Sequence, residues 1–132
     1  MPGTTFLIAA ALLLAPFAAC GGGSENSTPV GTPGTAFNVT MEDNKFEPNT
    51  LLAVAGATIT ISLTNKGQAT HNMRIAGEDG VLNTDDDALS DPITIVGGKD
   101  GKVTWKAPAK PGEYKFQCDF HLDAMTGTII LK

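Results

Sequence analysis

The chain has 132 residues, 42% of them hydrophobic and 17% charged, with 14 acidic against 9 basic side chains and a net charge of −5. This length accommodates one domain, and the hydrophobic content is enough for a folded core, which excludes wholesale disorder. The acidic balance argues against binding nucleic acid or an anionic membrane through a basic surface. Two cysteines exclude a disulfide-rich scaffold and a four-cysteine zinc site.

The N-terminus carries an apolar stretch, residues 6–19, which is followed by Cys20. A membrane-spanning helix needs about 20 apolar residues, so the stretch is too short to span but has the length of a signal-peptide core. Small residues precede the cysteine, and residues 17–20 (FAAC) resemble a bacterial lipoprotein cleavage box. We expect residues 1–19 to be a lipoprotein-type signal peptide, cleaved before Cys20, with an ordinary secretory signal as the alternative. Both predict export to the periplasm or the cell-envelope surface.

A segment rich in Gly, Ser, Thr and Pro follows, with Val30 as its one hydrophobic residue. Such a composition buries too little apolar surface to offset the entropy lost on ordering. We predict that residues 20–35 are a lipid-anchored flexible linker with an r.m.s. span of about 20 Å. Residues 36–132 are then a single domain.

This domain shows the alternation of hydrophobic and polar residues that is typical of half-buried strands. Alternating segments lie at residues 37–41, 59–63, 103–105 and 114–118, and a last strand is expected at residues 126–131. Turn residues separate the segments, and fifteen glycines and eight prolines favour many turns over a helix bundle. We predict an all-β fold, an antiparallel sandwich of seven or eight short strands.

The only histidines of the chain accompany the only cysteine of the predicted domain. His121 follows Cys118 by three residues and precedes Met125 by four, while His71 lies upstream at the start of a strand-like run. Two imidazoles, one thiolate and one thioether are the ligand set of a blue-copper site. Taken singly, each residue has an ordinary role in a core or on a surface, but their clustering favours a metal site.

From residue 37 to residue 132 the chain resembles the cupredoxins, the family of plastocyanin, amicyanin and azurin. Four segments carry the resemblance: residues 46–50 (FEPNT), residues 54–59 (VAGATI), His71-Asn72, and residues 111–118 (PGEYKFQC). The resemblance implies a Greek-key β-sandwich that holds one type 1 copper ion per chain.

The resemblance also implies the roles of the site residues. His71, Cys118 and His121 would be equatorial ligands and Met125 the axial one. Asn72 would pin the two ligand-bearing loops together, with its backbone amide donating toward the Cys118 sulfur and tuning the reduction potential. Three residues separate His121 from Met125, against four in plastocyanins and two in amicyanins, so the axial bond length does not carry over.

The function implied is one-electron transfer between Cu(I) and Cu(II), by a carrier that is not an enzyme and has no small-molecule substrate. The expected partners are redox proteins such as cytochromes or oxidases, and the membrane is contacted only through the lipid anchor. His121 lies between Phe120 and Leu122, which matches the apolar electron port of the family. Asp119 and Asp123 are either solvated or bias docking toward a basic partner.

Several alternatives compete with this interpretation. A binuclear copper centre needs a second cysteine where Leu122 stands, and a multicopper oxidase needs more than two histidines. Zinc is a minor alternative for the same site, because availability decides which metal is loaded. A copper-handling lipoprotein that delivers or sequesters the ion is the rival from another class. A structural sandwich that has lost its metal is the least favoured.

Residues 78–91 hold six acidic residues and no basic one. Their oxygens suggest either a calcium loop, with ligands from Asp79, Asn83, Asp85 and Asp87, or an acidic docking patch. The spacing of an EF-hand is missing. We therefore expect a solvated insertion loop.

Overall fold

The computed structural model describes residue 3 and residues 31–132. The expected signal peptide, Cys20 and most of the expected linker lie outside the described residues. The described residues include no helical segment with the length and hydrophobicity of a membrane span. Gly34 and Thr35, the last two residues of the expected linker, already bond to the domain: the Gly34 amide donates to the Leu52 carbonyl (3.0 Å), and the Thr35 carbonyl accepts from Thr60 (2.9 Å).

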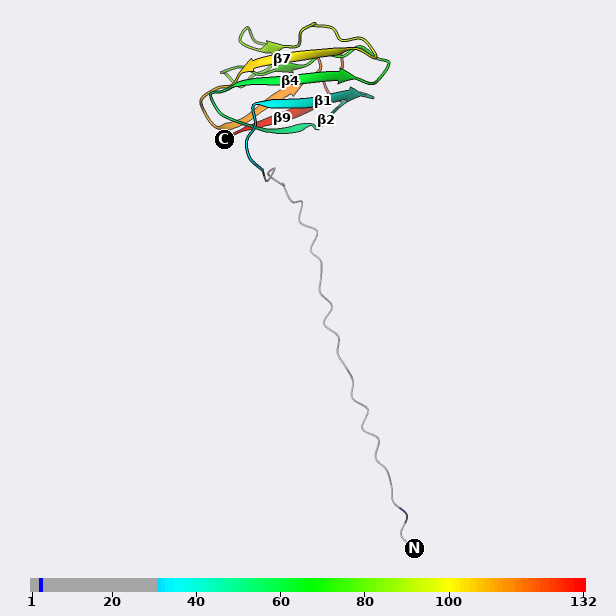
Figure 1. Ribbon diagram of the computed structural model, residues 1–132, viewed down its shortest axis with the longest axis vertical. Helices are drawn as coiled ribbons and strands as arrows, with labels where there is room; N and C mark the ends of the chain where they lie inside the picture. Colours follow the sequence, from blue (N-terminus) through cyan, green and yellow to red (C-terminus); the bar gives the residue numbers. More distant parts are fainter. Residues whose placement is uncertain (1–2, 4–30) are drawn as a thin grey trace.

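The described residues form nine strands in two sheets. The first sheet has the order β2 (Lys45–Glu47), β1 (Ala36–Glu42), β4 (Thr58–Asn65), β7 (Asp100–Lys106). The second has the order β3 (Thr50–Ala53), β9 (Thr126–Leu131), β8 (Gly112–Gln117), β5 (Arg74–Ile75), β6 (Ala88–Leu89). Figure 1 shows β7, β4 and β1 side by side in one layer. The predicted all-β sandwich is confirmed, with nine strands among the described residues in place of the seven or eight expected.

Two strand pairs are parallel, so the expectation of a purely antiparallel sandwich is wrong in this respect. β1 runs parallel to β4, with Phe37 opposite Ile61, and β3 runs parallel to β9. Asp43 and Asn44, with φ of 48° and 61°, form the two-residue turn that makes β1 and β2 an antiparallel hairpin. The chain then passes to the second sheet as β3 before it returns as β4. β1 and β4 are thus joined by a crossover, which permits parallel pairing.

The core lies between the two sheets, and alternating side chains of each strand fill it. Burial alternates along all of β4. In β8, Tyr114 and Phe116 are buried, and Cys118 directly after the strand is buried too, as the alternation predicts. Cys118 is therefore held at the end of a strand that aromatic side chains fix in the core.

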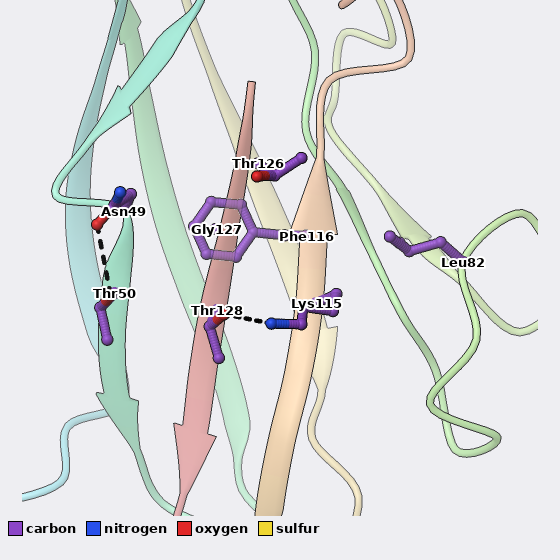
Figure 2. A pocket seen from close by; sticks show the side chains of 8 residues that line it. All are labelled: Asn49, Thr50, Leu82, Lys115, Phe116, Thr126, Gly127 and Thr128. Atoms are coloured by element: carbon purple, nitrogen blue, oxygen red, sulfur yellow. Dashed lines mark hydrogen bonds between the residues drawn. The ribbon is translucent and has the colours of Figure 1, made fainter. Parts of the chain in front are cut away.

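A close approach of β8 to β9 fixes the strand before the cysteine. Figure 2 shows the Phe116 ring against β9 at Gly127, where a Cβ atom would lie 2.1 Å from the ring. The ring also meets Phe46 edge-on, with the centroids 5.1 Å apart. Only glycine leaves room for this ring.

Candidate metal centre

The loop between β4 and β5 positions His71. Asn65 ends β4 with its side chain buried; its Nδ2 donates to the carbonyls of Ala69 and Ile95 (2.8 Å each), and its Oδ1 accepts from the Gly67 amide (3.0 Å). The backbone of His71 exchanges two hydrogen bonds with Ile95 (3.0 and 2.9 Å). The loop is therefore held by the Asn65 side chain and by the backbone of Ile95, and the His71 side chain is fully buried.

The loop between β8 and β9, residues 118–125, carries the other three predicted ligands, and we call it the ligand loop. The Cys118 amide donates to the Met125 carbonyl (3.0 Å), and the Met125 amide donates to the His121 carbonyl (2.9 Å). The His121 amide in turn donates to the Cys118 carbonyl (3.2 Å). These bonds close the loop on itself, with Met125 buried and His121 partly exposed.

Three donor atoms converge where the two loops meet. The Cys118 sulfur lies 3.9 Å from Nδ1 of His71 and 3.7 Å from Nδ1 of His121, and the ligating atoms of the three residues all lie within 4.8 Å of one another. A trigonal metal ion with bonds of about 2.3 Å to sulfur and about 2.0 Å to nitrogen would hold sulfur and nitrogen about 3.7 Å apart. The spacing therefore fits one metal ion.

The protonation of His71 also suits metal binding. Burial, and secondarily the nearby His121, lower the pKa of His71, so the neutral ring is favoured near neutral pH. Its Nε2 is buried without a hydrogen-bond partner among the described residues. A proton on Nε2 leaves the lone pair of Nδ1 directed at the Cys118 sulfur, which is the form that a metal needs.

Asn72 and Asp119, the residues that follow His71 and Cys118, link the two loops directly. The buried Asn72 side chain donates from Nδ2 to Asp119 Oδ2 (3.0 Å) and accepts from the Asp119 amide at Oδ1 (2.8 Å). In the described residues, the link between the two loops is made by the side chain of Asn72. The hydrogen bond from the Asn72 amide to the sulfur stays a prediction.

The carboxylate of Asp119 is paired, which corrects the expectation that it is solvated or free to steer docking. Arg74 donates to it from Nε (2.9 Å) and Nη2 (3.0 Å), and these bonds hold the pKa of Asp119 below its usual range. Sequence reasoning missed this pair. The available signal was that Arg74 is the only arginine of the chain and lies three residues after His71.

The acidic loop, residues 78–91, uses several of its carboxylates as internal acceptors. Asp87 accepts from the Asn83 amide (2.7 Å) and pairs with Arg74 Nη1 (3.2 Å), and its side chain is only 1% exposed. Asp86 accepts from the Thr84 hydroxyl (2.7 Å). The expectation of a solvated loop therefore fails at Asp87. Among the described residues, the loop offers no cluster of three acids close enough to hold a metal ion.

A separate pocket lies on the second sheet, and its lining residues are labelled in Figure 2. Its one titratable side chain is Lys115, which donates to the Thr128 hydroxyl (3.1 Å). Apart from this lysine the lining has no acid, thiol or imidazole, so the pocket offers no set of side chains that could hold a metal ion. The convergent cluster of His71, Cys118 and His121 is the better candidate site.

Known proteins with a similar sequence pattern or structure agree with the fold and with this cluster. The chain belongs to the family described as the cupredoxin-like domain, whose model matches residues 5–131. No curated protein sequence matches the chain significantly.

Solved structures share the fold. The chain is similar to reduced auracyanin from Roseiflexus castenholzii, with a TM-score of 0.64 and 22% identity over 76% of this chain and 99% of that one. It is also similar to auracyanin A, a "blue" copper protein from Chloroflexus aurantiacus, with a TM-score of 0.56 and 24% identity over 72% of this chain and 99% of that one. The reduced Cu(I) form of a point mutant of amicyanin gives a TM-score of 0.54 and 20% identity, covering 76% and 86% of the two chains. These likenesses confirm the cupredoxin fold.

Proposed function

We propose that this protein is a one-electron carrier that holds one copper ion between His71, Cys118 and His121, with Met125 as the axial ligand. The supporting observation is the convergence of two imidazole nitrogens and one thiol sulfur within 4.8 Å. Met125 is buried, and its backbone bonds to both Cys118 and His121. A thioether ligand from this residue would favour copper over zinc, because soft sulfur ligands stabilise Cu(I). Bound copper would supply the couple between Cu(I) and Cu(II).

Backbone hydrogen bonds hold the segments that carry the proposed ligands. The backbone of His71 is paired with Ile95, and the backbone of Met125 closes the ligand loop onto Cys118. A backbone fixed in this way limits how far the side chains can move when the charge of a bound ion changes. Small rearrangement favours fast electron transfer, so the rigidity supports a carrier.

The exposed edge of the site is apolar. Phe120 is 49% exposed and Leu122 52% exposed, and they flank the partly exposed ring of His121. A small apolar surface around one ligand suits brief docking of a redox partner such as a cytochrome or an oxidase. No substrate bond is made or broken in such an encounter, so the protein is a carrier and not an enzyme.

Cyclic voltammetry combined with a chelator challenge separates the carrier from a copper-delivery protein. The copper-loaded protein is expected to give a reversible one-electron wave, and to keep its copper in both oxidation states when a Cu(I) chelator is added. Met125→Leu should raise the potential while the copper stays bound, because a weak axial donor is removed. An irreversible wave, with copper lost on reduction, would favour delivery or sequestration.

We also propose that the protein is exported and tethered to the cell envelope by a lipid on Cys20. Support comes from the apolar stretch of residues 6–19 and the small residues before the cysteine. Cells fed labelled palmitate should incorporate the label into the wild-type protein and into Cys118→Ser, but not into Cys20→Ser. Unlabelled wild-type protein released in soluble form would favour an ordinary secretory signal.

A further inference from the structure

Arg74 on β5 binds two carboxylates that come from different parts of the chain. Its Nε and Nη2 donate to the two oxygens of Asp119 (2.9 and 3.0 Å), a bidentate pair, and its Nη1 donates to Asp87 (3.2 Å). The arginine side chain is 20% exposed, against 26% for Asp119 and 1% for Asp87. Bidentate pairs fix orientation as well as distance.

The first carboxylate belongs to the metal centre. Asp119 directly follows Cys118, and it holds the Asn72 side chain through two hydrogen bonds, one to its carboxylate and one from its amide. Asn72 directly follows His71. The guanidinium therefore fixes the one carboxylate that ties the His71 segment to the Cys118 segment.

The second carboxylate anchors the acidic loop. Asp87 accepts from the amides of Asn83 (2.7 Å) and Thr84 (3.3 Å), so it organises the turn at the centre of the loop. Among the described residues, Arg74 makes the only ion pairs, and both join other segments to β5. One side chain thus connects the acidic loop to the ligand loop.

We propose that Arg74 is a positioning residue for the metal centre: it holds Asp119 against Asn72, balances the charge beside Cys118 and couples the acidic loop to the ligand loop. The copper readouts of this inference rest on the proposed function. Without the arginine, both carboxylates lose their counter-charge, and the loss is most unfavourable for Asp87, whose side chain is only 1% exposed. The added negative charge also favours the higher oxidation state of a bound ion.

The test compares variants of the full chain. Arg74→Gln removes both ion pairs, Arg74→Lys keeps the charge without the bidentate geometry, and Asp87→Asn weakens only the contact with the acidic loop. Lys102→Gln is the matched control, because it removes the same charge from an exposed lysine of β7. Amide hydrogen exchange is measured on the copper-free proteins, and the reduction potential and the visible spectrum on the copper-loaded ones.

We expect Arg74→Gln to speed amide exchange in residues 118–125 at least tenfold and to lower the potential further than Lys102→Gln does. Arg74→Lys should restore most of the potential but not the protection from exchange. Asp87→Asn should speed exchange in the acidic loop and, to a smaller extent, in the ligand loop. If Arg74→Gln does not fold, Arg74→Lys and Asp87→Asn still decide the matter, because each keeps one part of the network.

The inference would be overturned if Arg74→Gln had the same amide exchange rates, reduction potential and visible spectrum as Lys102→Gln. An Asp87→Asn effect confined to residues 78–91 would refute the coupling between the two loops. The two proposals fail separately. A wild-type protein without a blue spectrum refutes the proposed function, whereas unchanged exchange in the copper-free variants refutes the positioning role alone.

Discussion

Asn65 shows how one buried side chain shapes the route of the chain into the metal centre. Its amide group makes three hydrogen bonds, to Gly67, Ala69 and Ile95, within the segments that hold His71. All three partners are backbone groups, so the bonds define the path of the loop. A residue that the sequence presents as the end of a strand thus determines where His71 lies.

Replacing this side chain tests its role. Asn65→Ala should lower the free energy of unfolding of the copper-free protein by about 3 kcal/mol, because backbone groups are left without partners and each costs about 1–3 kcal/mol when buried. Denaturant unfolding measures the change. Asn38→Ala, an exposed position on β1, is the control and should change stability by less than about 0.5 kcal/mol. An equal stability of the two variants would contradict the role given to Asn65.

The close contact at Gly127 predicts that a larger residue there lowers the stability of the fold. A Cβ atom there would lie 2.1 Å from the Phe116 ring and 2.6 Å from the Asn49 carbonyl, so Gly127→Ala forces the ring and the Asn49 segment to move. We expect a loss of about 2–3 kcal/mol in unfolding free energy, as for other overpacked cores. Gly31→Ala, where the nearest atom lies 4.0 Å away, should be close to neutral. Similar unfolding free energies for the two alanine variants would show that the structure around Gly127 adjusts to the added methyl group without losing stability.

At the scale of elements, the long strands were predictable and the connections between segments were not. β1, β4, β7, β8 and β9 each have enough residues for the alternating pattern to appear, whereas β6 has two. Parallel pairing of β1 with β4 depends on a passage through the second sheet, which no local pattern records. The candidate ligands were visible because histidine and cysteine are rare in this chain and cluster around one loop. The partners of Arg74 were hidden, because Asp87 and Asp119 lie far along the chain from it.

The hydrogen bonds of the acidic loop predict that the stability of its turn depends on pH. The hydroxyl of Thr84 donates to Asp86 and is the main cause that lowers the pKa of Asp86 below 3.8. The ionised carboxylate therefore stabilises the turn above that ordinary pKa, and this contribution is lost as the pH falls through the lower pKa of the folded loop. An NMR titration of the Asp86 carboxyl carbon should give a midpoint below 3.8 that rises in Thr84→Ala. The same midpoint in the wild type and in Thr84→Ala would show that the hydroxyl contributes nothing to the lowered pKa of Asp86.

For the whole molecule, the net charge of −5 affects how often two copies come into contact. Like-charged molecules repel each other, and salt shortens the range of the repulsion from about 30 Å at 0.01 M to about 10 Å at 0.1 M. We expect electron self-exchange between the oxidised and reduced protein to become faster as salt is raised over this range. NMR line broadening in mixtures measures the rate. A self-exchange rate that falls with salt would mean that oppositely charged surfaces bring the two copies together.

The proposed function requires that Cys118 binds copper as a thiolate. Titrating the copper-free protein with Cu(II), with visible absorption and electron paramagnetic resonance recorded together, detects this bond. We predict an intense thiolate-to-copper band that saturates at one copper ion per chain and is lost in Cys118→Ser. A colourless protein, or a weak copper spectrum that Cys118→Ser leaves unchanged, would contradict the proposed function and favour a metal-handling or structural role.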